Sequence, residues 1–187
     1  MILYGGSYSQ AGQESFVINS LKEKRNGFYV EIGAYDSKIM SNTYLLETEY
    51  GWSGMALEID PTRSNEYNSN RSNKCVTADA TTFNYLDYFI ENNVPERVDY
   101  LQVDIEPAPQ SLQALKALPL DRYRFSIVTF EHDLYVDPSN ALVKQEAIEI
   151  LTKYNYKLVK ENVMHEGNIF EDWWIDREIL EEVGVIC

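Results

Sequence analysis

The chain has 187 residues, 44% of them hydrophobic, which suits a single domain whose core is large enough to fold without disulfides. Thirty acidic residues against 16 basic ones give a net charge of −14, and no run of Lys or Arg offsets it, which argues against a nucleic-acid partner. Only Cys75 and Cys187 are present, no signal peptide is recognisable, and no apolar run approaches the roughly 20 residues of a membrane-spanning helix. We therefore expect one domain over residues 1–187, cytoplasmic and not membrane-bound.

Short apolar runs alternate with amphipathic segments along the whole chain. The apolar runs, rich in β-branched and aromatic residues, predict strands at residues 27–33, 54–60, 74–79, 98–106, 124–133, 156–163 and 173–175. The amphipathic segments predict helices around residues 16–21, 41–50, 83–89, 112–115 and 142–151. Asp60 and Asp137 are predicted N-caps, each followed by a proline, so a further helix begins after Asp60. This alternation favours an α/β fold with a mostly parallel sheet and helices on both faces.

An acidic residue lies at or just past the end of each of five successive predicted strands: Glu31, Glu58, Asp79, Asp104 and Glu131. Because the carboxyl ends of parallel strands share one edge, we expect these acids to line one crevice. For any single acid, an ordinary turn or cap role explains its position equally well. Gly33 stands alone where a dinucleotide-binding enzyme would have G-x-G-x-x-G. The acids suit a ligand with hydroxyls and positive charge, such as S-adenosylmethionine.

Four ordered blocks carry a resemblance to a known family. They are FYVEIGAYDSKIMSNTYLLETEYGWSGMALEIDP at 28–61, VDYLQVDIE at 98–106, YRFSIVTFEHD at 123–133 and FEDWWI at 170–175. These blocks resemble FkbM-type S-adenosylmethionine-dependent methyltransferases, including compact members from bacterial viruses. The resemblance implies a Rossmann-like class I methyltransferase fold with about seven strands, the last one antiparallel. Ser37 and Pro107 stand where that family usually has glycine.

The resemblance also implies a binding role for several residues of the first block. Gly33, which has no Cβ, would let the backbone approach the methionine part of S-adenosylmethionine. Glu31 would hold the cofactor's ammonium directly or through water. Asp36 belongs to the same turn, and Asn42 either fixes the loop over the cofactor or is a plain helix N-terminal residue.

The remaining cofactor contacts are expected at the ends of the second, third and fourth strands. Glu58 would accept hydrogen bonds from both ribose hydroxyls, since a carboxylate has two acceptor oxygens. Asp79 would take the adenine amino group, beside the backbone of Ala80. Asp104 would lie closest to the point of methyl transfer.

An alcohol acceptor needs a base, and the candidates are Asp104, Glu106, Glu131, His132 and Asp133. We prefer Asp104 and His132, because an imidazole titrates near neutral pH, although a lone histidine is more often structural. The same groups could hold Mg²⁺ or Mn²⁺, but clustered acids are more often simply solvated, and we expect no metal. Trp173 and Trp174 could stack on a sugar, yet core packing explains them better.

The expected function is methyl transfer to a hydroxyl of a small, carbohydrate-like acceptor. Two alternatives stay open. One is an S-adenosylmethionine-binding module without transfer activity, suggested by Ser37 and Pro107. The other is a different nucleotide-linked α/β enzyme that uses NAD without the glycine fingerprint. The sequence indicates neither an acceptor nor an oligomeric state. Titration of the protein with S-adenosylmethionine, S-adenosylhomocysteine and NAD distinguishes the three functional hypotheses.

Overall fold

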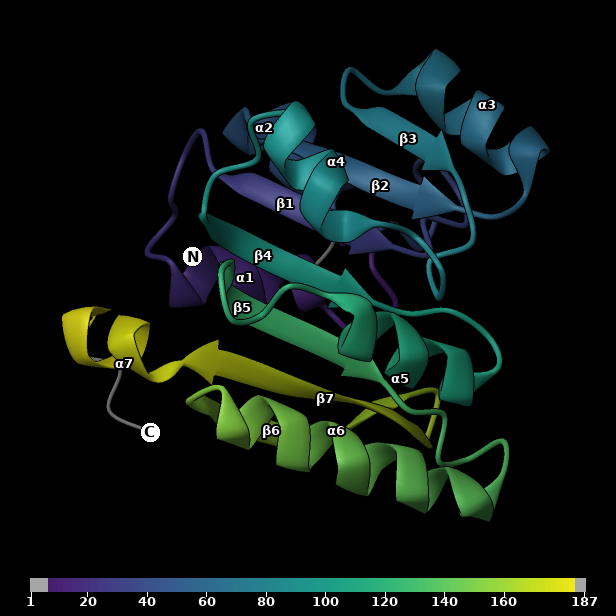
Figure 1. Ribbon diagram of the computed structural model, residues 1–187, viewed down its shortest axis with the longest axis vertical. Coiled ribbons are helices and arrows are strands. Elements are labelled where there is room, and N and C mark those ends of the chain that lie inside the picture. Colours follow the sequence, from purple (N-terminus) through teal and green to yellow (C-terminus); the bar gives the residue numbers. More distant parts are fainter. Residues whose placement is uncertain (1–6, 184–187) are drawn as a thin grey trace.

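A single seven-stranded sheet organises the part of the chain, residues 7–183, that the structure, a computed structural model, describes. Cys187 lies outside these residues. The sheet order is β3-β2-β1-β4-β5-β7-β6, and the arrowheads of β1 to β5 point to one edge (Figure 1). β7 is antiparallel to both neighbours, which confirms the predicted mostly parallel sheet with an antiparallel last strand. The strands are β1 (Phe28–Ile32), β2 (Ser53–Glu58), β3 (Lys74–Thr77), β4 (Arg97–Val103), β5 (Arg124–Glu131), β6 (Tyr156–His165) and β7 (Asn168–Asp176).

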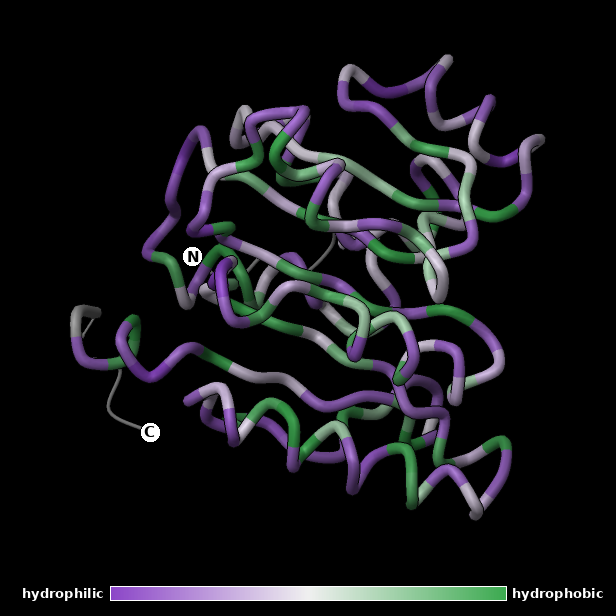
Figure 2. The backbone as a smooth tube through the Cα atoms, viewed as in Figure 1, coloured by the Kyte–Doolittle hydropathy of each residue, from purple (hydrophilic) through white to green (hydrophobic). Residues whose placement is uncertain are grey.

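Helices cover both faces of the sheet. The larger core cluster packs α4, α5 and α6 against the face turned to the viewer in Figure 1, and a second cluster packs α1, α2 and α7 against the other face. The hydropathy colouring follows this arrangement, with apolar segments along the strands and a largely hydrophilic α3 at the edge of the molecule (Figure 2). The helices are α1 (Gln13–Ser20), α2 (Tyr44–Tyr50), α3 (Pro61–Asn70), α4 (Tyr85–Glu91), α5 (Ala108–Ala117), α6 (Ala141–Lys153) and α7 (Arg177–Val183). Within residues 7–183, none of these helices has the length and hydrophobicity needed to cross a bilayer.

Helix starts follow the capping residues with two differences from the prediction. Asp60 accepts a hydrogen bond from the backbone N–H of Thr62 at 2.7 Å, so α3 begins at Pro61 as predicted. Asp137 caps a 3-10 turn, η1 (Pro138–Asn140), and α6 begins only after it. The second predicted helix begins at Tyr44 instead of residue 41, because the Ser41 hydroxyl accepts the N–H of Tyr44 from outside the helix.

The C-terminal part contains an element that the sequence analysis missed. α7 follows β7 directly. Its only apolar pair, Ile179 and Leu180, is too short a pattern to distinguish a helix from a continuation of the preceding strand. Trp173 and Trp174 are both buried within β7, which confirms that they pack in the core. Trp173 stacks on Phe16 of α1 with 4.5 Å between ring centroids.

The end of β1 lies against the backbone that follows β4. Gly33 has a φ of +86°, and a Cβ built on it would lie 1.7 Å from the carbonyl oxygen of Asp104. Glycine is therefore required here by the neighbouring strand, in addition to any approach of a ligand. This contact holds the two strand ends together at the place where the order of the sheet reverses.

We predict that Gly33→Ala destabilises the protein by more than about 3 kcal/mol, because the methyl group must displace a strand backbone in addition to the left-handed strain. Gly167 is a matched control, since it has a φ of +85° but nothing within 4 Å of a built Cβ. Gly167→Ala should therefore cost only about 1–2 kcal/mol. Urea unfolding of both variants measures the difference, and equal losses would show that the Asp104 contact is unimportant.

Candidate active site

One cavity of about 420 Å³ opens at the carboxyl ends of the parallel strands. This volume lies within the usual range of about 300–1,000 Å³ for small-molecule sites. The structure brings to its wall all five acids from the strand ends: Glu31, Glu58, Asp79, Asp104 and Glu131. Gly33, Asn42, Ala80 and Glu106 also line it.

The β2 and β3 end of the cavity presents two carboxylates held by backbone donors. Glu58 accepts the N–H groups of Tyr35 and Asp60, each at 2.9 Å and each on a different oxygen. Both oxygens keep a lone pair for a ligand. Asp79 accepts the hydroxyl and the N–H of Thr81 at 2.7 and 2.9 Å, and these bonds lower the pKa of its exposed carboxyl. The carbonyl of Ala80 is fixed by the hydroxyl of Tyr85 at 2.9 Å.

Glu31 and Asn42 form the wall at the end of β1. Burial raises the pKa of Glu31 to about 7, although the Arg71 charge and hydrogen bonds from Thr43 and Tyr67 oppose that rise. Asn42 is buried, and its Oδ1 has no hydrogen-bond partner within the described residues. A buried amide oxygen without a donor is rare in proteins, so its place in the cavity wall suits a ligand that donates.

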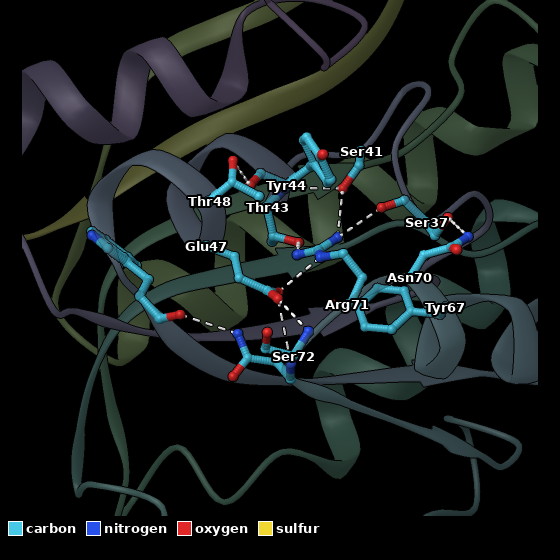
Figure 3. A network of polar contacts seen from close by, with 12 residues as sticks. Ser37, Ser41, Thr43, Tyr44, Glu47, Thr48, Tyr67, Asn70, Arg71 and Ser72 are labelled. Atoms are coloured by element: carbon cyan, nitrogen blue, oxygen red, sulfur yellow. Dashed lines mark hydrogen bonds and ion pairs between the residues drawn. The ribbon is translucent and has the colours of Figure 1, made fainter.

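Arg71 is the residue of this region that the sequence analysis missed. It follows α3 in a hydrophilic stretch, where no spacing distinguishes it from Arg63. The fold buries its side chain completely beneath the loop between β1 and α2, where it pairs with Glu47 at 2.8 Å (Figure 3). Only the tertiary structure brings it within two hydrogen bonds of Glu31.

Three carboxyl groups meet at the β4 and β5 end of the cavity. Asp104 and Glu131 hydrogen-bond to each other, and Asp133 hydrogen-bonds to Glu131. Burial raises the pKa of both Asp104 and Glu131, and the charge of Asp104 raises that of Glu131 further. The pKa of Glu131 is raised well above its usual range, so this group of carboxyls retains a proton at a higher pH than free carboxyl groups would.

Asp36 and His132 lie outside the cavity wall, as does the candidate base Asp133. Asp36 closes a turn by accepting the N–H groups of Lys38 and Ile39 at 2.8 and 2.7 Å. His132 is fully buried behind the acids, with its Nε2 3.5 Å from Asp172. Asp36 and His132 are each adjacent in sequence to a residue that lines the cavity. Among residues 7–183 there is no group of three or more His, Cys, Asp and Glu side chains arranged to hold a metal ion.

The two departures from the family pattern are accommodated locally. The Ser37 side chain is buried and accepts a hydrogen bond from Asn70 at 2.9 Å, while its carbonyl accepts one from Arg71 at 3.0 Å. Pro107 follows Glu106 through a cis peptide bond, and α5 begins at the next residue. Ser37 therefore ties the loop to the end of α3 without closing the cavity.

Similarity to known proteins lies in the fold. No family model and no curated sequence matches the chain. A putative O-methyltransferase from Klebsiella pneumoniae matches with a TM-score of 0.61 and 13% identity over 94% of this chain and 83% of its own. A putative rRNA-methylase from Clostridium thermocellum matches with a TM-score of 0.60 and 10% identity over 91% of this chain and 97% of its own. An O-methyltransferase from Bacillus cereus in complex with SAH matches with a TM-score of 0.58 and 15% identity over 92% of this chain and 83% of its own. The FkbM family is not established by these matches; the chain has the Rossmann-like fold of class I S-adenosylmethionine-dependent methyltransferases.

Proposed function

We propose that this protein is an S-adenosylmethionine-dependent methyltransferase that methylates a hydroxyl of a small, carbohydrate-like acceptor. The observation that carries the proposal is the charge of the cavity, whose described wall contains six carboxyl groups and neither Lys nor Arg. Residues 1–6 and 184–187 contain no Lys or Arg either. Such a wall favours a cationic, hydroxyl-rich ligand and disfavours phosphates. We keep membership of the FkbM family and a cytoplasmic location as parts of the same proposal.

The wall residues fit S-adenosylmethionine, which would supply a methyl group already activated on a sulfonium. We assign Glu58 to the ribose hydroxyls, because each of its oxygens keeps a free lone pair. Asp79 and the backbone of Ala80 would take the adenine. Glu31 and the unpartnered Oδ1 of Asn42 would face the ammonium. Asp36 would act indirectly, through the turn that follows Gly33.

We assign the acceptor to the β4 and β5 end. Asp104 is the proposed base: its carboxylate would accept the proton of the acceptor hydroxyl, and the proton of Glu131 would hold it in place. Polar groups of Gln10, Glu106, Gln110 and Tyr135 line the same end, and they could hydrogen-bond to several hydroxyls of a sugar-like molecule. His132 is the second candidate for the base.

The binding assignment is tested with Glu58→Ala. Loss of the contacts to both ribose hydroxyls should weaken S-adenosylhomocysteine binding by about 1.5–3 kcal/mol, or about 10- to 160-fold, by calorimetry. Glu66→Ala is the control, because Glu66 is an exposed residue of α3 away from the cavity. An unchanged affinity in Glu58→Ala would mean that the ligand binds at another place on the protein. Binding of NAD by the parent would favour a nucleotide-linked enzyme that uses NAD.

The chemical assignment is tested with Asp104→Asn. Release of S-adenosylhomocysteine, screened first on a panel of glycans and metabolites, should fall by about 10²- to 10⁴-fold while cofactor binding persists. His132→Asn is the comparison, and a fall confined to that variant would make His132 the base. A parent that binds the cofactor but methylates no member of a broad panel would favour a binding module without transfer activity.

A further inference from the structure

Arg71 makes several hydrogen bonds in addition to its ion pair with Glu47. Its Nε contacts Glu47 at 2.8 Å, which already provides a counter-charge. Its Nη1 donates to the carbonyl of Ser37 at 3.0 Å and to the hydroxyl of Ser41 at 3.3 Å, at two points of the loop that forms the cavity rim (Figure 3). The guanidinium thus holds this loop from below, at a place where its own side chain is fully buried.

The remaining nitrogen of Arg71 begins a hydroxyl relay that ends on Glu31, and it also contacts one of a pair of tyrosines beside that carboxyl. Nη2 donates to the Thr43 hydroxyl at 3.0 Å, and that hydroxyl donates to Glu31 at 2.8 Å. Nη2 also donates to the Tyr29 hydroxyl at 3.1 Å, which donates to Glu47 at 3.0 Å. The Tyr29 hydroxyl lies 2.9 Å from that of Tyr67, and Tyr67 donates to Glu31 at 3.4 Å. Because a guanidinium can only donate, the Thr43 hydroxyl that accepts from it keeps its own hydrogen for Glu31.

We propose that Arg71 is a positioning residue for the ammonium end of S-adenosylmethionine, setting both the orientation of the Glu31 carboxylate and the loop that carries Asn42. The inference rests on the proposed function for its ligand. Asn42 immediately precedes Thr43, so one guanidinium controls both groups assigned to the ammonium. Arg71 does not line the cavity and acts only through these neighbours.

The charges around Glu31 make this role measurable. Arg71 lowers the pKa of Glu31 and Glu47 raises it, against a larger rise caused by burial. Tyr29 and Tyr67, and Tyr100 of β4, are neutral near pH 7, because burial raises their pKa values. Burial likewise raises the pKa of the Cys75 thiol on the β3 side, to about 11. Arg71 and Glu47 are therefore the charged neighbours that decide when Glu31 ionises.

The test compares two ligands by calorimetry between about pH 6 and 9. S-adenosylhomocysteine has the ammonium, and methylthioadenosine lacks it while keeping the ribose and adenine. In the parent, affinity for S-adenosylhomocysteine should rise as Glu31 ionises near pH 7, and affinity for methylthioadenosine should stay flat. Arg71→Met should weaken S-adenosylhomocysteine binding at least about tenfold and shift its rise to higher pH, while changing methylthioadenosine binding less than about threefold.

Arg124→Met is the matched control. Arg124 also pairs with a buried acid, Asp176 at 2.9 Å, and donates to the carbonyl of Tyr154, but it begins β5 at the edge of the sheet opposite the cavity. Its loss should leave both affinities and the pH profile unchanged. The inference would be overturned if Arg71→Met weakened the binding of both ligands equally. It would also be overturned if the variant kept the parent's dependence of S-adenosylhomocysteine affinity on pH.

Thr43→Val provides a second variant in case Arg71→Met does not fold. It removes one relay hydroxyl that caps no helix, so it should give a smaller loss with the same preference for S-adenosylhomocysteine. An unselective effect in this variant also contradicts the inference. A parent that binds neither ligand would refute the proposed function itself, and the inference with it.

Discussion

At Gly33 the end of β1 runs against the carbonyl oxygen of Asp104, and the separation leaves no room for a Cβ. The two strands part immediately afterwards, because their following helices pack on opposite faces of the sheet. The crevice that opens there is the cavity, with Glu31 on one side and Asp104 on the other. The part of the cavity proposed to bind the cofactor's ammonium and the part proposed to bind the acceptor therefore meet beside this contact. Their separation is set by two backbones in contact and not by the packing of side chains.

The sequence was sufficient for most of the secondary structure and for the placement of the five acids. Alternating apolar runs and capped helix starts are local signals, and parallel strands necessarily bring their carboxyl ends to one edge. Side-chain direction was harder to predict. Glu131 lines the cavity while His132 points into the protein, because successive residues of an extended segment face opposite sides. Arg71 gave no signal, since its partners come from segments 24 to 42 residues away.

Several buried acids lower the stability of the fold as pH rises. Burial raises the pKa of Glu171 to about 8 and that of Glu31 to about 7, so each binds a proton more tightly in the folded chain than in the unfolded one. Their stabilising contribution is complete below the unfolded pKa and is lost as pH rises through the folded value. Glu171 accepts the indole N–H of Trp173 at 2.5 Å and lies outside the cavity wall, whereas Glu31 lines it. Of these two acids, only Glu31 lies where a cation bound in the cavity would offset this loss.

β7 lies between β5 and β6, although it is the last strand of the sheet to be synthesised. Until its residues leave the ribosome, the edge of β5 has no partner, and β6 has no strand through which to join the sheet. The nascent chain therefore carries an open sheet edge next to the segment that contains Asp104 and Glu131. The backbone N–H groups of His132, Asp133 and Tyr135 donate to the carbonyls of Phe170 and Ile169 in β7, so the segment beside the proposed acceptor side of the cavity is held in place only after the last strand inserts.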